Sequence, residues 1–237
     1  MSEEVQLALA FDHRPALGGE DFLVAPPNAQ AVAWIDRWPD WPTPSLALWG
    51  PPGCGKTHLV NVFVARSGAH IVTADDLASE AAAQMAAAWP ACAVDDAERV
   101  AAGAEEALLH LHNALAENGR RLLLAARRPP SRWRLGLADL ASRLRAAPAA
   151  EICAPDDALM AAVLVKLFAD RQLRVDTGVV SFMLARMARS FAAARRLVAA
   201  VDAAALARRR NITVPLVRQV IDGPGGAEGE GDGGGEG

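Results

Sequence analysis

Short apolar runs alternate with helix-like stretches over the first two thirds of the chain. The runs are LALW, HIVT, ACAV and RLLLAA, at residues 46–49, 70–73, 91–94 and 121–126. Their length is that of strands buried on both faces, and the segments between them are long enough for helices. The pattern predicts an α/β fold, in which helices cover both faces of a parallel sheet.

Beyond residue 154 the pattern changes to helices alone. Three Ala-rich amphipathic stretches follow one another without a strand between them, over residues 157–171, 177–188 and 191–210. Thr213 followed by Pro215 is typical of the start of one more helix. We therefore expect an α/β domain over residues 13–154 and a small helical domain over residues 155–222.

The two ends of the chain differ from its middle. Residues 223–237 hold nine Gly and four acidic residues and no large apolar side chain, so they are predicted to be disordered. Near the start, QLALAF (Gln6 to Phe11) has acidic flanks and is too short for an export signal. From its residues alone it is either an extra edge strand or a docking peptide within a flexible segment, residues 1–12.

Composition excludes some classes of protein. No run approaches the roughly 18 apolar residues of a membrane span, and three cysteines without metal-ligand spacing suit a reducing compartment. We therefore expect a cytoplasmic protein without membrane contact. Residues 141–222 carry 13 basic and 7 acidic residues, against 11 and 17 in residues 1–140. That asymmetry fits a lobe that faces phosphates or an acidic partner, or simply a solvated helical face.

GPPGCGKT matches the phosphate-loop pattern G-x-x-x-x-G-K-[ST] and lies between a predicted strand and a predicted helix. Glycines allow backbone N–H groups to surround phosphate oxygens, and the helix N-terminus adds a positive dipole. We expect Lys56 to reach the β- and γ-phosphates and the Thr57 hydroxyl to bind Mg²⁺. The alternative is a Gly/Pro turn that carries Lys-Thr by chance. The predicted nucleotide-binding residues here are Gly50, Pro51, Pro52, Gly53, Cys54, Gly55, Lys56, Thr57 and His58.

Two adjacent acids, Asp95 and Asp96, follow the predicted strand at 91–94. Such a pair is often only a helix cap. Downstream of a phosphate loop, a carboxylate at the end of a neighbouring strand is well placed to hold the metal. We expect Asp95 to complete the Mg²⁺ shell and Asp96 to orient the attacking water.

These residues resemble the AAA+ ATPases, in particular the branch that contains the bacterial replication initiator DnaA. The resemblance spans roughly residues 20–222: DFLVAPPNAQA is similar to the leading segment, and GPPGCGKTHL and AVDDAE to the phosphate loop and acidic strand. It implies an AAA+ P-loop NTPase with a helical lid, which binds ADP or ATP with Mg²⁺ and has Asn28 near the adenine. LADLASRL resembles the box that ends in the arginine finger, at Arg143. A surface arginine paired with Asp139 is the alternative.

Two differences from DnaA make the whole chain similar to the Hda family of regulatory inactivators of DnaA, most closely its HdaA form. A Gly/Glu tail stands where DnaA has a DNA-binding domain, and QLALAF is similar to the Q-L-x-L-x-F sequence by which Hda docks on the sliding clamp. The resemblance implies two partners, DnaA and the β subunit of DNA polymerase III, with DNA contact indirect or weak and self-association left open. It places Arg143 at ATP held by DnaA, and the clamp-binding residues are Gln6, Leu7, Leu9 and Phe11.

The same resemblance predicts weak ATP hydrolysis by the chain itself, with ADP as the resident ligand. LLLAARRPPSRW is similar to the sensor-1 strand and puts Arg127 at the sensor position. RSFAAARRLV puts Ala192 where a sensor-2 arginine is expected, although Arg195 and Arg196 follow. Two other functions stay open. One is an autonomous ATPase of the helicase-loader or remodeller type, and the other is a non-catalytic tether on the clamp.

Overall fold

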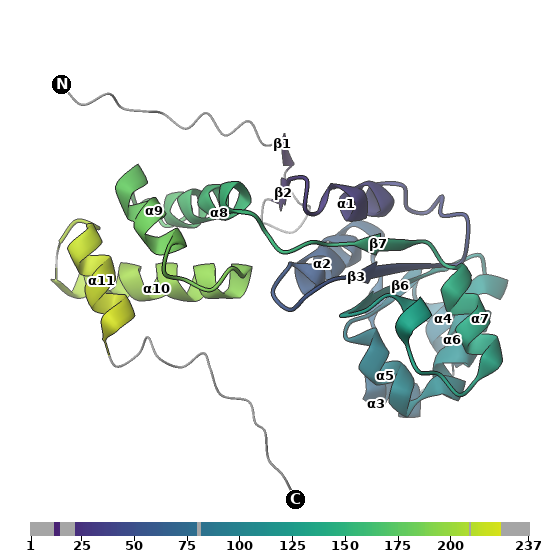
Figure 1. The fold of residues 1–237 in the computed structure, drawn as a ribbon. Coiled ribbons are helices and arrows are strands. Elements are labelled where there is room, and N and C mark those ends of the chain that lie inside the picture. The colour runs from purple at the N-terminus through teal and green to yellow at the C-terminus, as the bar shows by residue number, and fades with distance from the viewer. Residues whose placement is uncertain (1–11, 15–21, 80–81, 209, 224–237) are drawn as a thin grey trace, which may run out of the picture. The chain divides into compact units, whose positions relative to one another are not determined.

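The computed structural model of the chain describes residues 12–14, 22–79, 82–208 and 210–223. Its described residues form two compact units, an α/β unit that extends to Ala154 and a helical unit that begins at Pro155 (Figure 1). QLALAF and the Gly/Glu tail lie outside the described residues. None of the helices described is long and apolar enough to cross a membrane.

The α/β unit is built on a five-stranded parallel sheet with the strand order β4-β5-β6-β3-β7. Four of its strands confirm the predicted runs: β3 (Ser45–Trp49), β4 (His70–Ile71), β5 (Ala91–Val94) and β6 (Arg121–Ala126). The fifth strand, β7 (Ala149–Glu151), was not predicted because its sequence AAE forms no apolar run, and only its middle residue is buried. The α/β fold class is confirmed.

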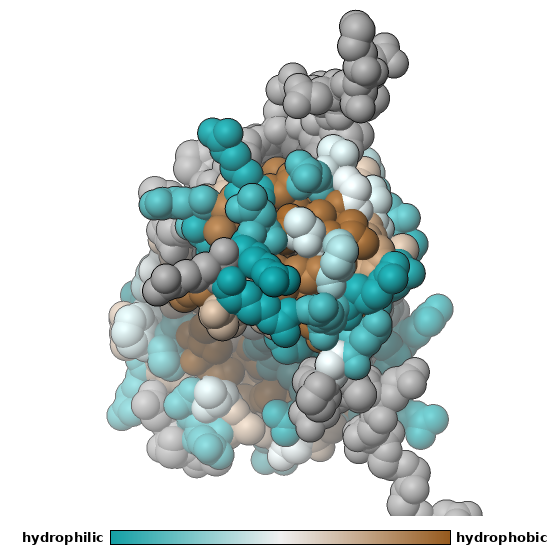
Figure 2. All heavy atoms as spheres, turned by 90° about the vertical axis from the view of Figure 1, so that its left-hand side faces the viewer, coloured by the Kyte–Doolittle hydropathy of each residue, from teal (hydrophilic) through white to brown (hydrophobic). Residues whose placement is uncertain are grey.

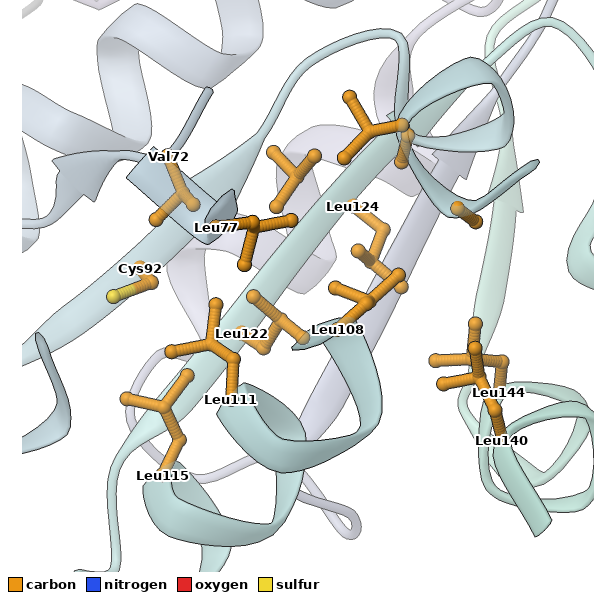
Figure 3. Packing of buried hydrophobic residues seen from close by; sticks show 14 of the residues in the cluster. Val72, Leu77, Cys92, Leu108, Leu111, Leu115, Leu122, Leu124, Leu140 and Leu144 are labelled. Atoms are coloured by element: carbon orange, nitrogen blue, oxygen red, sulfur yellow. The ribbon is translucent and has the colours of Figure 1, made fainter. Parts of the chain in front are cut away.

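Alternate residues of the central strands face opposite sides of the sheet, as the period of two requires. Leu122 and Leu124 of β6 belong to one core cluster, whereas Leu123 belongs to another. The first cluster is closed by α6 (Glu105–Glu117), whose Leu108, Leu111 and Leu115 point at β5 and β6 (Figure 3). The sheet is thus buried on both faces, which explains its continuous apolar strands.

Four more helices and one 3₁₀ turn lie along the chain between β4 and β7. They are α3 (Ala74–Ser79), α4 (Ala82–Ala88), α5 (Ala97–Gly103), the turn η1 (Pro130–Arg132) and α7 (Ala138–Ala146). Buried residues of every one of these helices pack in the same cluster as α6, for example Leu140 and Leu144 of α7.

The other face of the sheet is covered by α1 (Ala29–Asp36) and α2 (Lys56–Ser67). α1 ends at Asp36, and Trp38 lies in the turn beyond it, where the following Pro39 disfavours a helical conformation of Trp38. Trp38 still packs on this face, with its ring edge-on to Phe63 at 6.2 Å.

A short antiparallel pair precedes the main sheet. β1 (Asp12–Arg14) pairs with β2 (Phe22–Val24), and His13 stands opposite Leu23. β1 begins directly after QLALAF, at Asp12, the last residue of the segment that was expected to be flexible. Its sequence DHR has no alternating apolar pattern, so the pairing rests on backbone hydrogen bonds that periodicity does not reveal.

The helical unit holds four helices, which confirm the predicted ones with slightly shorter ends. They are α8 (Asp157–Ala169), α9 (Thr177–Leu184), α10 (Phe191–Arg208) and α11 (Val214–Asp222). Their apolar faces enclose a separate core that contains Met160, Phe168 and Met183. Asp156 caps α8, because its side chain accepts a hydrogen bond from the Leu159 N–H at 2.7 Å.

Candidate functional site

The phosphate loop, Gly50–Thr57, follows the carboxyl end of β3 and leads directly into α2. Gly53 and Gly55 have φ angles of 76° and 103°, in the region that glycine tolerates and other residues avoid. At Gly50 the constraint is space, since a Cβ there would lie 2.1 Å from the backbone oxygen of Ile152. The loop sequence therefore needs its glycines for backbone geometry, as expected for a loop that surrounds an anion.

Neighbouring strands hold the start of this loop in place. The Gly50 N–H donates to the carbonyl oxygen of Ala126, the last residue of β6, at 3.2 Å. On the other side, the Ile152 N–H donates to the Trp49 carbonyl oxygen at 2.7 Å. The loop thus emerges at the carboxyl edge of the sheet, where open α/β sheets bind their ligands.

Lys56 folds back over the loop that precedes it. Its ammonium donates to the carbonyl oxygens of Gly50 and Pro51, each at 2.8 Å. It also lies 3.8 Å from the Cys54 sulfur, a buried thiol whose pKa is raised by desolvation. The ammonium therefore lies against the loop that leads into α2, so its positive charge and the dipole at the start of the helix both favour an anion at this loop.

The hydroxyl of Thr57 donates to Oδ2 of Asp95 at 2.6 Å. The second carboxylate oxygen, Oδ1, accepts the Asp96 N–H at 2.9 Å and so fixes the plane of the group. Two predicted metal ligands, 38 residues apart in sequence, thus meet because β5 and β3 end at the same edge of the sheet. Oxygen donors of this kind are those that Mg²⁺ prefers.

Thr57 and Asp95 would supply only part of the coordination shell of Mg²⁺, and other oxygens would have to complete it. Among the described residues, no group of three or more His, Cys, Asp or Glu side chains is placed to hold a metal. Mg²⁺ normally keeps several waters and binds through one or two protein groups together with substrate phosphates. Thr57 and Asp95 fit that mode of binding, with the phosphates of the nucleotide supplying the remainder.

Asp96 follows in a left-handed conformation, with a φ of 51°, at the start of α5. Its Oδ2 accepts a hydrogen bond from Nε of Arg99 at 2.9 Å; the Arg99 side chain is largely exposed and that of Asp96 is half-buried. The predicted role in orienting water therefore stays a prediction, and it would require this carboxylate to exchange partners.

The end of β6 brings two arginines to the same edge of the sheet. Arg127 is exposed there, between the ends of β5 and β3. The Arg128 guanidinium instead binds the Glu98 carboxylate, which raises the arginine's pKa, and the Arg128 carbonyl oxygen accepts the Trp133 indole N–H at 2.7 Å. Arg127 is exposed and Arg128 is paired with Glu98, and the sensor role of Arg127 stays a prediction.

Asn28 is buried, and its side chain amide is committed to the backbone beside it. Oδ1 accepts the Ala25 N–H at 2.9 Å, and Nδ2 donates to the Leu23 carbonyl oxygen at 3.0 Å. The predicted place near the adenine stays a prediction. These bonds indicate that Asn28 shapes the segment before α1 through its backbone contacts.

Arg143 lies on the exposed face of α7, and Nε donates to Oδ1 of Asp139 at 3.0 Å, one turn earlier. This is the ion pair that the alternative interpretation expected. Leu140 and Leu144 are buried on the opposite side and fix α7 against the core. No hydrogen bond or ion pair given for the described residues joins Arg143 to the phosphate loop of the same chain.

One supporting residue was missed by the sequence analysis. Both oxygens of Glu105 accept backbone N–H groups from the segment that leads into α7, Gly136 at 2.9 Å and Leu137 at 2.6 Å. These bonds lower the pKa of Glu105 below its ordinary value. Glu105 precedes this segment by more than 30 residues, so no local signal marks it, yet it positions the start of the helix that carries Arg143.

Comparison with known proteins identifies relatives of both units. Residues 157–221 match the family described as the lid domain of Hda. A Haemophilus influenzae protein, itself uncharacterised, is 26% identical over an alignment of 193 residues, and the match covers 77% of this chain and 84% of that protein.

Solved structures of AAA+ proteins share the fold. Domain III of the replication initiation protein DnaA of Thermotoga maritima has a TM-score of 0.71 and 16% identity, with 84% of this chain and 93% of that chain covered. AMPPCP-bound DnaA from Aquifex aeolicus has a TM-score of 0.65 and 18% identity, over 76% and 63% of the two chains. The RuvB Holliday junction branch migration motor of Thermotoga maritima reaches 0.62 and 16% identity, over 83% and 66%.

Proposed function

Because the chain is an Hda- and DnaA-like AAA+ protein, we propose that it regulates replication initiation by stimulating ATP hydrolysis on DnaA. The observation that carries this proposal is the lid match at residues 157–221, on a chain that also has a fully formed phosphate loop. In this account the chain binds adenine nucleotide for itself and supplies Arg143 to the nucleotide of its partner.

The nucleotide of this chain would be ADP or ATP with Mg²⁺. The loop glycines and the start of α2 would surround its phosphates, while Lys56 would exchange the Gly50 and Pro51 carbonyl oxygens for phosphate oxygens. Thr57 and Asp95 would hold Mg²⁺, which supplies charge neutralisation at the phosphates. The similarity to AMPPCP-bound DnaA from Aquifex aeolicus supports an adenine nucleotide.

Arg143 has the properties that a finger acting on another protein requires. Its side chain is 42% exposed, and its only bond described is to the exposed carboxylate of Asp139. Exposed ion pairs of this kind contribute about 0.2–1 kcal/mol, so the guanidinium can leave Asp139 at small cost. A guanidinium supplied to a neighbour's phosphoryl group accelerates its transfer by roughly 10³–10⁵-fold.

The second part of the proposal is that the chain docks on the sliding clamp. It rests on the sequence QLALAF, since Gln6, Leu7, Leu9 and Phe11 lie outside the described residues. Phe11 directly precedes β1, which is paired to β2. A clamp bound at this peptide would therefore be held close to the α/β unit that carries Arg143.

The test measures ATP hydrolysis by DnaA in the presence of clamp-loaded DNA. Wild-type chain should stimulate hydrolysis, and Arg143→Ala should bind nucleotide and clamp normally but fail to stimulate. Phe11→Ala should stimulate only when the chain is added at high concentration, because this variant loses attachment to the clamp but keeps Arg143. Normal stimulation by Arg143→Ala would contradict the finger assignment, and normal clamp binding by Phe11→Ala would contradict the docking assignment.

The paired Thr57 and Asp95 side chains also favour a second candidate function, an autonomous ATPase. It predicts appreciable ATP turnover by the purified chain without DnaA, lost in Lys56→Ala. Turnover that is absent from the purified chain, with nucleotide binding intact, would exclude it.

A further inference from the structure

Two arginines of the helical unit converge on one aromatic ring. The guanidinium carbon of Arg186, just beyond α9, lies 3.9 Å from the centroid of the Phe182 ring, and that of Arg218 in α11 lies 5.5 Å from it. Both arginines are exposed, while Phe182 is half-buried at the edge of the helical core. The two guanidiniums carry like charges and repel each other. Their attraction to the face of the Phe182 ring opposes this repulsion.

Neither guanidinium has a carboxylate partner among the described residues. Other cations of the same unit do: Arg189 pairs with Asp157 at 3.0 Å, Arg171 with Asp202 at 3.6 Å and Lys166 with Asp170 at 2.7 Å. The charge on Arg186 and Arg218 is therefore uncompensated, in contrast to that of these three cations. Two guanidiniums without carboxylate partners raise the local positive potential, which attracts an anion.

A third guanidinium without a carboxylate partner among the described residues contacts the neighbouring position of α11. Arg208, in the last turn of α10, donates to the side-chain oxygen of Gln219, the residue that follows Arg218. An amide oxygen is a neutral partner, so the charge of Arg208 also remains. Figure 2 faces the outer side of α9 and α11 and shows hydrophilic side chains gathered around apolar ones over this part of the unit.

The position of a guanidinium over the ring determines which kind of anion it can bind. A guanidinium that lies over a ring uses its face for the ring and keeps its N–H groups in the plane, directed outward. Planar N–H groups match phosphate oxygens in a bidentate manner. The three arginines lie on the surface, outside any pocket described, so they suit an extended polyanion better than an enclosed small molecule.

We propose that Arg186, Arg218 and Arg208 form a binding site for the phosphate backbone of nucleic acid. Phe182 attracts both guanidiniums, which lie 3.9 and 5.5 Å from its ring centroid. Contacts would be made by the guanidiniums to phosphates, which makes binding independent of sequence and sensitive to salt. A site of three cations gives a weak contact, suited to a protein that another interaction brings to DNA.

The experiment measures fluorescence anisotropy of a labelled single-stranded oligonucleotide of mixed sequence over a series of salt concentrations. The full chain is compared with Arg186→Ala/Arg218→Ala and with the control Arg171→Ala/Arg189→Ala. The control removes the same charge from arginines that are paired with Asp202 and Asp157. DnaA, clamp and nucleotide are omitted, so failure of this inference is distinguishable from failure of the proposed function.

Wild type and the control should show the same dependence of log affinity on log salt. The Arg186/Arg218 variant should bind more weakly, with a slope reduced by about one for each arginine removed. A wild-type slope in that variant would overturn the proposal, as would an equal loss in the control, which would indicate net charge alone. Binding of a Glu-rich peptide through these arginines without binding of DNA would also overturn it. Unchanged circular dichroism and melting temperature verify that each variant is folded.

Discussion

The Thr57 hydroxyl and the Asp95 carboxylate lie 2.6 Å apart at the carboxyl edge of the sheet, joined by a hydrogen bond. They come from the first turn of α2 and the end of β5, so the pairing follows from parallel strands that end at one edge. Both groups are oxygen donors, and the distance between them leaves them able to bind one cation.

Removal of the Thr57 hydroxyl should therefore weaken binding of the Mg²⁺ complex of the nucleotide. Thr57→Val keeps the shape of the side chain and removes one oxygen ligand, and we expect roughly 10- to 100-fold weaker binding of Mg²⁺-ATP. Titration of a fluorescent ATP analogue with and without Mg²⁺ measures this. Thr57→Ser retains the hydroxyl and should bind normally, and equal losses with and without Mg²⁺ in the Val variant would contradict the metal role.

The close approach of Gly50 to Ile152 predicts a stability effect. Gly50→Ala would place a Cβ 2.1 Å from a backbone oxygen, which cannot move as a flexible side chain does. We expect a loss of at least about 1–3 kcal/mol in the free energy of unfolding, together with weaker nucleotide binding. Urea denaturation measures the first quantity.

A matched control for this substitution lies in α9. Gly178 has no atom within 4 Å of its added Cβ, so Gly178→Ala should be neutral or should stabilise the helix by about 0.5–1 kcal/mol. Equal stabilities of the Gly50 and Gly178 variants would show that the loop can shift away from Ile152.

Burial of His112 predicts a pH dependence of stability. The ring lies in α6, its Nε2 is 3.4 Å from the Ser45 hydroxyl oxygen, and its Nδ1 is buried without a hydrogen-bond partner. Desolvation, with a smaller effect of the Arg143 charge, lowers the pKa of His112 below its ordinary value of 6.5, against smaller opposing effects of Asn113 and Asp139. The unfolded chain therefore takes up a proton at higher pH than the folded chain does.

The contribution of His112 to stability is thus present above pH 6.5 and is lost as the pH falls below that value. The loss is limited to about 1.4 kcal/mol for each pH unit. The free energy of unfolding, measured by urea between pH 7.5 and 5, should fall in the wild type and change less in His112→Gln. Identical pH profiles would show that other groups account for the decrease.

The sequence was sufficient to predict the parts of the molecule whose structure depends on a local pattern of residues. The phosphate loop, the acids after β5 and the strands β3, β5 and β6 each have such a pattern, because burial on both faces demands a continuous apolar run. β7 was missed because three residues at the edge of the sheet bury only one side chain.

Other features could not be predicted because they depend on contacts between distant residues. Glu105 binds the backbone before α7 across 31 and 32 residues of sequence. The convergence of Arg186 and Arg218 on Phe182 likewise requires the packing of α11 beside the end of α9. Periodicity identifies the helices of this unit but gives no information on which of their exposed side chains meet.

The most direct test of the central claim compares two variants of one ion pair. Asp139→Ala and Arg143→Ala both remove the bond between these side chains, but only the second removes the guanidinium. The rate of a single turnover of ATP bound to DnaA, with clamp-loaded DNA and saturating chain, should be stimulated normally by Asp139→Ala. Arg143→Ala should lose roughly 10³-fold or more of that stimulation. Equal stimulation by the two variants would contradict the claim that Arg143 acts on the nucleotide of DnaA.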